Sequence, residues 1–490
     1  MPTIELVLRD ENGQMMGQQS VKKYPLDWKS QSFHDIEGAV ETFKQVALPD
    51  IEASLLEAAQ NAFIRDKKTD LSCNGKIPVT LKTLHGRLRF EVQRFKDHRQ
   101  PNEKDQTYFD LTNQFKKIYV SDRLQELAGY YSTLLSYANV ANLIHRVTGD
   151  RQLSDQKIWQ IVADKMLEIS QFWKIEVEER LEDQELLVPK IQAEIDIYDG
   201  ESREILVFED AIQVRGQKEN RVHKQKLDEE KRERDPEKKK SPPVFTNVVM
   251  LQKKDKTDKT DKTDKTDKTD KTDKEFEYVV APIDEQGQET VPLPDVLKSR
   301  VIQEYGAESE PLPVVAITDG ARVIRQHLYS VFGIMLVIIL DWYHLGKKVR
   351  DLMSMIARNK EEKVIHLKFM FYHLWRGEID TVLDYLETKV QSKNEERHRE
   401  LIGYLNKHRD EIIDYQRRKK AGKMIGSGHI EKGCDQVIGH RQKKKGMSWR
   451  ETGSRGLGIL RVAELNHQWE RFWFPKEAAN DSENLQLASN

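Results

Sequence analysis

Residues Pro313–Leu328 read PVVAITDGARVIRQHL. The apolar, β-branched first half predicts a buried strand, and the pattern becomes helical after Gly320. Asp319 lies between the predicted strand and the predicted helix, at the carboxyl end of the strand. Open α/β folds have their active sites at this edge of the sheet. The same residue could instead be an ordinary N-cap of the following helix. Both interpretations predict an α/β domain built around this strand.

Further apolar runs predict the rest of the sheet. After the helix comes FGIMLVIILDWYH, and upstream lie IQAEIDIYDG, ILVFEDAIQV, FTNVVMLQ and EFEYVVAP. A helix, LPDVLKSRVIQEYG, precedes Pro313. If FTNVVMLQ and EFEYVVAP are two halves of one broken strand, the order is three strands, helix, strand, helix, strand. A ribonuclease-H-like core has that order.

Two polar insertions separate the upstream strands. The residues between ILVFEDAIQV and FTNVVMLQ are almost all charged, and residues 255–272 read DKT six times. Segments without apolar side chains cannot bury enough surface to offset the loss of chain entropy. We therefore expect disordered loops, over about 217–274, that interrupt the domain.

The composition limits the number of domains and the classes of partner. A chain of 490 residues is long enough for two to four domains with buried cores. Lys and Arg (80) nearly balance Asp and Glu (82), so the net charge of −2 predicts no polyanion partner. Any surface that binds nucleic acid must therefore be local.

Nothing in the sequence predicts export or a membrane partner. The N-terminus, MPTIELVLRDENG, lacks the basic start and apolar run of a signal peptide. The longest apolar run, Val331–Leu340, is too short to cross a bilayer. The two cysteines, Cys73 and Cys434, argue against a disulfide framework and a four-thiolate zinc site. We expect a protein of the reducing cytoplasm.

The N-terminal region, residues 1–120, combines two patterns. The helical stretch FHDIEGAVETFKQVALPDIEASLLEAAQNAF precedes an alternating one around His85-Gly86. The alternation predicts a β-hairpin, which we interpret as structural.

Residues 121–185 predict helices with one break. Gly149 ends the first helix, and Ser154 or Asp155 offers an N-cap for the second. This is the layout of a helix-turn-helix, whose second helix, near Gln156–Lys165, would enter a DNA major groove. Any αα-hairpin has a similar pattern, so the DNA-binding interpretation stays open.

Residues 346–425 predict a helical block. Its aromatic stripe consists of Phe369, Phe371, Tyr372 and Trp375, together with the aliphatic Leu374. Such a stripe either packs a small helical subdomain or stacks on bases, and helical spacing favours packing.

A basic segment follows the helical block. Between Arg417 and Arg450, eleven Lys and Arg residues stand against two acids, Glu431 and Asp435. The basic set includes Arg441, Lys443, Lys444 and Lys445. Such an excess predicts a phosphate-binding surface, with a merely solvated charge run as the alternative.

Three acids stand at strand ends or on a helix: Asp210, Asp319 and Glu431, the last on the helix begun by Gly426-Ser427-Gly428. Phosphodiester cleavage by two Mg²⁺ ions about 4 Å apart requires hard oxygen ligands from several elements. Three anions brought together without a cation would repel one another. The set therefore predicts a metal site, provided that the fold brings the three acids together.

Three motifs resemble those of the DDE transposases of bacterial insertion sequences. They are TDGAR at 318–322, LDWYH at 340–344, and GSGHIEKGCDQVIGHRQKKKGMSW at 426–449, which LRVAELNHQWERFW follows. The similarity is greatest to the ISKra family, related to the Mutator-like transposases, and covers roughly Tyr130–Trp473. Its most specific part is GSG-x-x-E.

The resemblance implies an α/β ribonuclease-H-like catalytic core, a mixed sheet flanked by helices, over 190–345 and 426–475. It also implies a helical insertion over 346–425 and an N-terminal helical DNA-binding region. Residues 476–490 would be a disordered tail. Many relatives carry a Cys-rich zinc ribbon, but here only Cys73 lies near the hairpin, so no structural zinc is expected.

The resemblance also assigns residues. Asp210, Asp319 and Glu431 would be catalytic and hold two Mg²⁺ ions, which Mn²⁺ could replace, with Asp196 as a rival for Asp210. Asp341-x-x-His344 matches a pair near the site of relatives, which either supports DNA binding or packs locally. Arg441, Lys443, Lys444 and Lys445 would hold DNA phosphates.

We therefore expect a DNA transposase that cleaves and transfers strands at the ends of its own element. Its partner would be double-stranded DNA, both terminal repeats and target, and the pairing of two ends implies a homo-oligomer. It would act in the bacterial cytoplasm, at the nucleoid. Two alternatives are an inactive or regulatory DNA-binding protein derived from a transposase, and a structure-specific nuclease on the same core.

Overall fold

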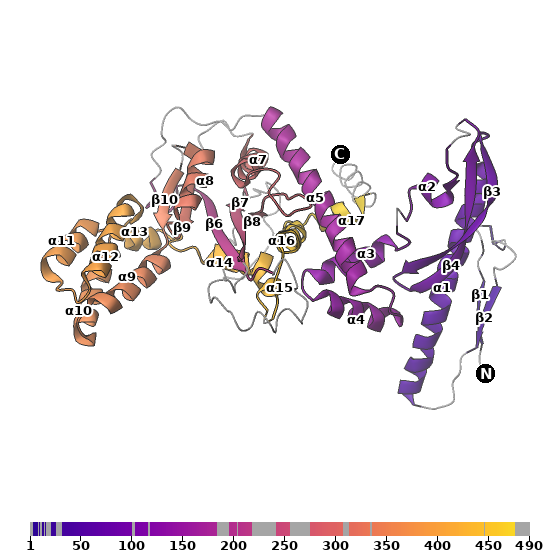
Figure 1. The fold of residues 1–490 in the computed structure, drawn as a ribbon, viewed down its shortest axis with the longest axis horizontal. Coiled ribbons are helices and arrows are strands. Elements are labelled where there is room, and N and C mark those ends of the chain that lie inside the picture. Colours follow the sequence, from indigo (N-terminus) through magenta and orange to yellow (C-terminus); the bar gives the residue numbers. More distant parts are fainter. Residues whose placement is uncertain are drawn as a thin grey trace, which may run out of the picture. The chain divides into compact units, whose positions relative to one another are not determined.

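The computed structural model divides the chain into two compact units (Figure 1). Unit 1 comprises Met1–Asp164 and Glu470–Asn490, and unit 2 comprises Lys165–Trp469. The structure describes residues 3–7, 9, 12–13, 15, 21–25, 32–99, 103–115, 118–183, 196–202, 204–217, 242–254, 275–306, 313–333, 336–444 and 446–475. The predicted loop tips and the predicted disordered tail, 476–490, lie outside these residues. No helix within these ranges is both long and apolar enough to cross a bilayer.

Unit 1 contains the predicted β-hairpin. Its elements are β1 (Thr3–Val7), β2 (Val21–Pro25), α1 (Phe33–Asp66), β3 (Leu71–Thr83), β4 (Gly86–Asp97), β5 (Gln106–Thr107), α2 (Tyr108–Thr112), α3 (Asp122–Ser132), α4 (Tyr137–Thr148) and the start of α5 (Asp155–Asp183). β3 and β4 pair antiparallel, and β5 extends the sheet. Alternate side chains of β4, Leu88, Phe90 and Val92, are buried in the core shared with α1, which confirms the hairpin prediction.

The helical break lies where the sequence predicts it. Gly149 caps α4 in the left-handed region with φ of 73°, a conformation that glycine adopts without a Cβ penalty. Ser154 caps α5, because its hydroxyl accepts the Lys157 N–H at 3.2 Å. α5 continues to Asp183, well beyond the expected recognition helix. Two consecutive helices are therefore present, and their role in DNA binding stays a prediction.

Unit 2 is a mixed α/β domain. Its strands are β6 (Ile205–Val214), β7 (Val244–Gln252), β8 (Phe276–Val279), β9 (Val314–Thr318) and β10 (Leu336–Leu340). They form one sheet in the order β10-β9-β6-β7-β8. β7 is antiparallel to its neighbours β6 and β8, whereas β9 runs parallel to both β6 and β10.

Helices complete unit 2. They are the rest of α5 from Lys165 on, α7 (Leu293–Tyr305), α8 (Arg322–Phe332), α9 (Trp342–Ile356), α10 (Lys360–Leu374), α11 (Ile379–Lys389), α12 (Glu395–Lys407), η4 (Arg409–Glu411), α13 (Tyr415–Lys420), α14 (Gly428–Cys434), η5 (Asp435–Gly439), α15 (His440–Gln442) and α16 (Glu451–Leu465). The short α17 (Trp469–Trp473) lies almost wholly in unit 1, although the sequence assigned it to the catalytic core.

The sheet corrects two strand predictions. Asp196–Gly200, the described part of IQAEIDIYDG, forms turns rather than a strand. FTNVVMLQ and EFEYVVAP form two antiparallel neighbours, β7 and β8, with Val249 opposite Val279, and are not halves of one strand. The three strands that precede the first core helix are therefore β6, β7 and β8. β7 also lies within the range 217–274 that the domain prediction gave to loops.

The DKT repeat connects two hydrogen-bonded strand ends. The Lys253 N–H donates to the Glu275 carbonyl oxygen at 2.8 Å, so both ends of the insertion are held by the β7–β8 ladder. Replacing Asp255–Lys274 with a short Asn-Gly turn should keep the fold and raise the free energy of unfolding by roughly 1 kcal/mol, because a shorter loop costs less closure entropy. Urea unfolding of the two chains measures this, and a large loss of stability would contradict it.

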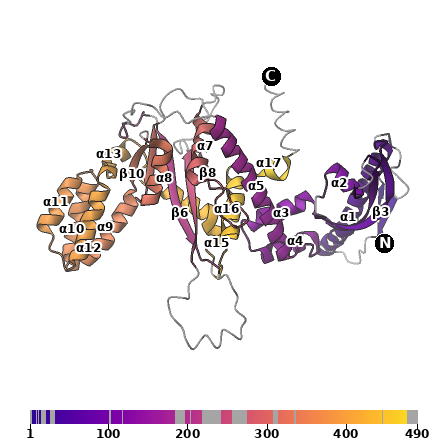
Figure 2. The ribbon, with the colours of Figure 1, turned by 45° about the horizontal axis from the view of Figure 1, so that its top comes forward.

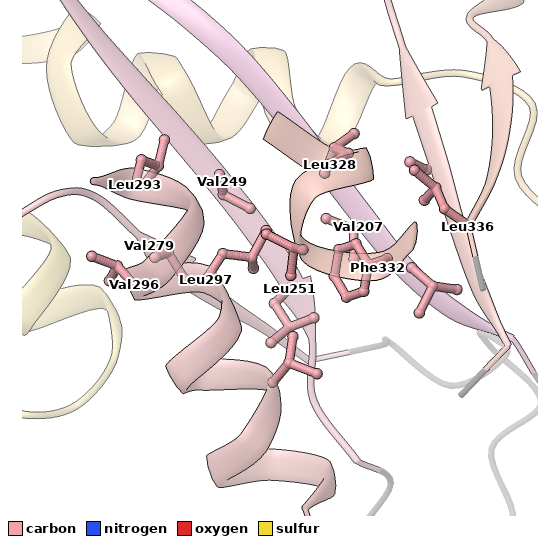
Figure 3. Packing of buried hydrophobic residues seen from close by; sticks show 14 of the residues in the cluster. Val207, Val249, Leu251, Val279, Leu293, Val296, Leu297, Leu328, Phe332 and Leu336 are labelled. Carbon is pink, nitrogen blue, oxygen red and sulfur yellow. The ribbon is translucent and has the colours of Figure 1, made fainter. Parts of the chain in front are cut away.

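The main core lies between the sheet and helices α7 and α8 (Figure 3). Val207, Val249, Leu251 and Val279 point from the strands toward Leu297, Leu328 and Phe332 of these helices. Each fully buried aliphatic or aromatic side chain contributes about 1.5–3 kcal/mol. α14 and α16 contact β7 on the opposite face, so the sheet is covered on both sides.

Helices α9 to α13 form a separate group beside β10 (Figure 2). The aromatic stripe mostly packs this group. Trp375 lies 4.7 Å from Trp342, ring centre to ring centre, and Phe369 stacks on Tyr385 at 3.9 Å. Tyr372 is the exposed member, and Arg376 covers its ring at 3.7 Å. These contacts agree with the packing interpretation.

Candidate functional site

Three aspartates lie at one level of three neighbouring strands. β6 and β9 are parallel with Val207 opposite Ala316, so Asp210 and Asp319, each three residues further on, are in register. β9 and β10 are parallel with Thr318 opposite Leu340, which places Asp341 level with Asp319. Neighbouring strands lie about 4.8 Å apart. Extended beyond the paired residues, this register places the three acids near the carboxyl edge of β9 and β10.

Asp210 faces α14 rather than the main core. Side chains alternate along a strand, and Phe208 on the same face stacks on His429 of α14 with ring centres 6.1 Å apart. Burial raises the pKa of Asp210, and the negative charges of Asp319 and Glu431 raise it further. The Ala211 N–H and the nearby His344 act in the opposite direction. The carboxylates from β6, the end of β9 and α14 therefore lie close enough to repel one another.

Asp319 is held by its own turn. Its Oδ1 accepts the Ala321 N–H at 2.8 Å, and its side chain does not cap α8, whose N-cap residue is Ala321. Gly320 follows with φ of 84°, in the left-handed region where a Cβ would be strained. The N-cap interpretation of Asp319 is therefore wrong, because its carboxylate bonds to the turn and Ala321 is the N-cap of α8.

Glu431 lies in the first turn of α14, which begins at Gly428 as the Gly-Ser-Gly motif predicts. Its side chain is 62% exposed, and one carboxylate oxygen lies 3.3 Å from His344 Nε2. Gly426 is required just before this helix, because a Cβ there would lie 2.6 Å from the ring of Tyr343. Close packing of α9 on the start of α14 thus brings Glu431 to the strand edge.

Asp341 joins the starts of α9 and α14. Its Oδ1 accepts the His344 N–H at 2.7 Å as the N-cap of α9, and its Oδ2 accepts the Ser427 N–H at the N-cap of α14. Asp341 is only 2% exposed, so its charge is stabilised by these backbone donors. The pair Asp341 and His344 therefore has a local packing role that positions Glu431.

Replacing Asp341 with Ala should lower the free energy of unfolding by about 2–4 kcal/mol, because two N–H groups at helix starts lose their acceptor. Replacement with Asn should cost less, since Asn keeps one acceptor oxygen and is a good N-cap. Urea unfolding measures both. The matched control is Asn359→Ala at the exposed N-cap of α10, with an expected loss of about 1 kcal/mol. Equal losses for Asp341→Ala and the control would contradict the two-helix role.

The carboxylates are suitable ligands for a divalent cation, but they are not arranged in the geometry of a coordination sphere. Within the described part of the chain, no three acidic, histidine or cysteine side chains are arranged to hold a metal ion. Carboxylate oxygens are nevertheless the ligands that Mg²⁺ prefers. Burial raises the pKa of Asp210, and the nearby negative charges of Asp319 and Glu431 raise it further. Asp210, Asp319 and Glu431 are the residues that would hold Mg²⁺.

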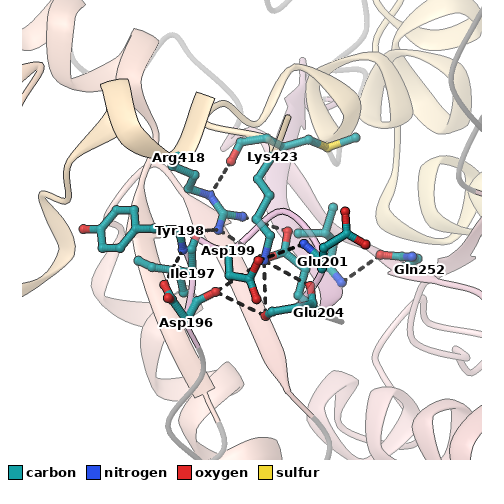
Figure 4. Close-up of polar contacts among 12 residues, drawn as sticks. Asp196, Ile197, Tyr198, Asp199, Glu201, Glu204, Gln252, Arg418 and Lys423 are labelled. Atoms are coloured by element: carbon teal, nitrogen blue, oxygen red, sulfur yellow. Dashed lines mark hydrogen bonds and ion pairs between the residues drawn. The ribbon is translucent and has the colours of Figure 1, made fainter. Parts of the chain in front are cut away.

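Asp196, the rival for the first acid, lies elsewhere. One of its carboxylate oxygens accepts the Tyr198 N–H at 2.9 Å, and its carbonyl oxygen lies 3.5 Å from Lys423 Nζ (Figure 4). This turn precedes the amino end of β6, whereas Asp210 interacts with Asp319 and Glu431. The structure therefore favours Asp210.

The basic segment contains both internal and exposed cations. Arg441 is buried, with its guanidinium 4.9 Å from the ring centre of Trp449 and 3.1 Å from the Met447 sulfur. This burial indicates a packing role for Arg441, and its contact with DNA stays a prediction. Lys443 and Lys444 are exposed, and Lys445 lies outside the described residues. The exposed cations of the described segment are Arg417, Lys419, Lys420, Lys432, Lys443, Lys444 and Arg450.

The sequence analysis missed Tyr404, on which the charges of Asp319 and Asp341 act, and Lys348, whose ammonium lies 5.9 Å from the ring centre of Tyr404. Lys348 lies one turn after His344 on α9, and Tyr404 comes from α12. The i, i+4 spacing from His344 could have identified Lys348. No local pattern marks Tyr404, because only the packing of α12 brings it close.

Comparison with known protein families gives a match over the C-terminal part of unit 2. Residues 295–472 match the family model of an uncharacterised protein family, UPF0236. The matched region is less than half of the chain and contains Asp319, Asp341 and Glu431, but not Asp210. No match was found among curated proteins.

Proposed function

We propose that this protein is a DNA transposase of an insertion sequence and that unit 2 is its catalytic core. The observation that supports this most is the meeting of Asp210, Asp319 and Glu431, which are far apart in sequence, at one sheet edge. The sheet order also supports a ribonuclease-H-like core, because three antiparallel strands are followed by two that run parallel to the first. Helices α9 to α13 would be the insertion that precedes the third acid.

The chemistry would be two successive phosphoryl transfers. In cleavage, a water oxygen attacks phosphorus, the P–O3′ bond breaks, and the products are a 3′ hydroxyl and a 5′ phosphate. In joining, that 3′ hydroxyl attacks a target phosphodiester, a new P–O3′ bond forms, and the displaced target oxygen leaves as a hydroxyl. Phosphodiester bonds are exchanged in the second step, so no oxidant or nucleotide is needed.

The side chains would have distinct tasks. Mg²⁺, when bound, supplies positive charge to the attacking and leaving oxygens. Asp210 and Asp319 would hold it from the rigid sheet, and Glu431 from α14. Asp341 keeps α14 in place through the Ser427 N–H. His344, 3.3 Å from Glu431, orients the third carboxylate.

DNA would be held by local positive charge and recognised by unit 1. Lys443 and Lys444 are exposed and would contribute salt-dependent affinity rather than sequence preference. The two-helix segment α4–α5 would recognise and bind the terminal repeats. The protein would act as a homo-oligomer at the nucleoid, since two element ends must be paired.

A second candidate is a regulatory DNA-binding protein that has lost cleavage. The exposed Lys443 and Lys444 support it, because phosphate binding by these cations does not require the three acids. It would bind the same DNA without cutting it.

Mapping of nicks separates these functions. The full chain is incubated with DNA that carries the flanking genomic sequences, with Mg²⁺ or with EDTA. A transposase cuts at the element ends only with Mg²⁺, a regulator binds without cutting, and a structure-specific nuclease cuts junctions without regard to the ends. Binding without any Mg²⁺-dependent nick would refute the proposed function.

A further inference from the structure

The helical group packs directly on the turn that carries Asp319. A Cβ added at Gly320 would lie 2.5 Å from Cε1 of His408, which follows the last turn of α12. His408 is buried, and its Nδ1 lies 2.6 Å from Glu411, whose other oxygen accepts a hydrogen bond from Arg325 of α8 at 2.7 Å. The end of α12 is therefore fixed beside the catalytic edge of the sheet.

Tyr404 lies one turn before His408 on α12. The two rings are 4.7 Å apart, centre to centre. Burial raises the pKa of Tyr404 to about 12, with further contributions from the negative charges of Asp319, Glu411 and Asp341. The phenol is therefore a protonated donor close to the acids. Among the described residues its hydroxyl has no hydrogen-bond partner.

Lys348 approaches the same place from α9. Its ammonium lies 5.9 Å from the ring centre of Tyr404 and donates to Glu400 at 2.8 Å. Arg397 also donates to Glu400, at 2.5 Å. Lys348 and Arg397 share the Glu400 carboxylate, and the charge of Glu396 also acts on Arg397. The ammonium of Lys348 is therefore placed between Glu400 and the ring of Tyr404. His344, one turn earlier on α9, faces Glu431, so one face of α9 links the acids to Lys348.

We propose that Tyr404 and Lys348 bind the phosphodiester that is cleaved at the acid site, with the Tyr404 hydroxyl donating to a non-bridging oxygen. This inference rests on the proposed function and deepens it. The three carboxylates repel a polyanion, so donors must face the phosphate from another element. The helical group supplies them, and the site is incomplete without α12.

The test is Tyr404→Phe, which removes the hydroxyl and keeps the ring that packs on His408. Single-turnover cleavage of end DNA should slow roughly 10- to 100-fold, because a hydrogen bond to a charged oxygen is lost. The melting temperature should not change. Lys348→Met should weaken DNA binding and lower the salt dependence of the affinity by about one charge.

A phosphorothioate at the scissile position distinguishes a phosphate contact from a structural role. If Tyr404 only stabilised the fold, the effect of sulfur on the cleavage rate would be the same in Tyr404→Phe and in the wild-type chain. Sulfur at the non-bridging oxygen should slow the wild-type chain but add little to the loss in Tyr404→Phe, because that contact is already absent. The matched control is Tyr372→Phe, an exposed tyrosine of the same helical group, which should cleave like the wild-type chain.

The outcomes distinguish this inference from the proposed function. If the wild-type chain cleaves, Glu431→Gln does not, and Tyr404→Phe matches the wild-type rate, the phosphate contact is refuted alone. Additive losses from sulfur and Tyr404→Phe also refute it. If neither the wild-type chain nor any variant cleaves, the proposed function fails and the inference fails with it.

Discussion

Glu431→Gln should abolish Mg²⁺-dependent strand cleavage, with a loss of about a thousandfold or more. Gln has the same shape, but it lacks the charge that a divalent cation requires, and metal catalysis is worth several kcal/mol of barrier. The side chain is 62% exposed, so the free energy of unfolding should change by less than about 0.5 kcal/mol. Cleavage of labelled end DNA and melting curves measure the two effects.

DNA affinity should stay nearly unchanged in Glu431→Gln, which separates chemistry from binding. The matched control is Asp435→Asn, four residues later in the same helical run, where the exposed carboxylate lies 2.7 Å from His440 Nε2. This control should cleave normally. Unchanged cleavage in Glu431→Gln would remove Glu431 from the site, and equal losses in both variants would indicate a general electrostatic effect.

Arg418→Met should lower the free energy of unfolding of unit 2 by about 3–5 kcal/mol. Arg418 is 0% exposed, and its guanidinium donates to both oxygens of Glu204, at 2.9 and 3.1 Å (Figure 4). It also donates to the carbonyl oxygens of Ile197 and Met424. Met fills similar volume, but it leaves the buried Glu204 carboxylate with Lys423 alone, at 3.2 Å. Urea unfolding measures the loss.

Two variants show whether the buried charge is the cause. Arg417→Ala removes the exposed neighbour, whose guanidinium lies 4.7 Å from the ring centre of Tyr198, and should cost less than about 1 kcal/mol. Combining Glu204→Met with Arg418→Met removes the bidentate ion pair, while Lys423 keeps its hydrogen bonds to Ser202 at 3.1 and 3.4 Å. The double variant should recover at least about 1 kcal/mol relative to the single variant. No recovery would show that packing, rather than the unpaired carboxylate, accounts for the loss.

The Arg418 cluster also bears on the site. The Met424 carbonyl that Arg418 holds comes just before Ile425, whose own carbonyl accepts the Trp342 N–H at 3.1 Å. The chain then enters α14 with Glu431. Loosening this anchor should therefore affect the position of the third acid, which makes Arg418 a positioning residue rather than a catalytic one.

Local patterns were sufficient for most elements of unit 2. Apolar, β-branched runs predicted β6, β7, β9 and β10, and helical spacing predicted α7 and α8, because backbone preferences and burial periodicity are properties of neighbouring residues. The motif at Gly426-Ser427-Gly428 likewise marked the start of α14. The strand predicted over IQAEIDIYDG failed over Asp196–Gly200, where turns form instead.

Tertiary structure alone determined which of the candidate residues meet. Asp196 and Asp210 are both aspartates within apolar runs, so the sequence alone does not distinguish them. The register of β6 with β9 favours Asp210 as the partner of Asp319. Arg418 and Lys443 belong to one basic segment, yet the first is buried against Glu204 and the second is exposed. The physical reason is that strand register and burial depend on contacts between residues that are distant in sequence. The identity of a residue does not show whether its side chain will be solvated or paired with a buried carboxylate.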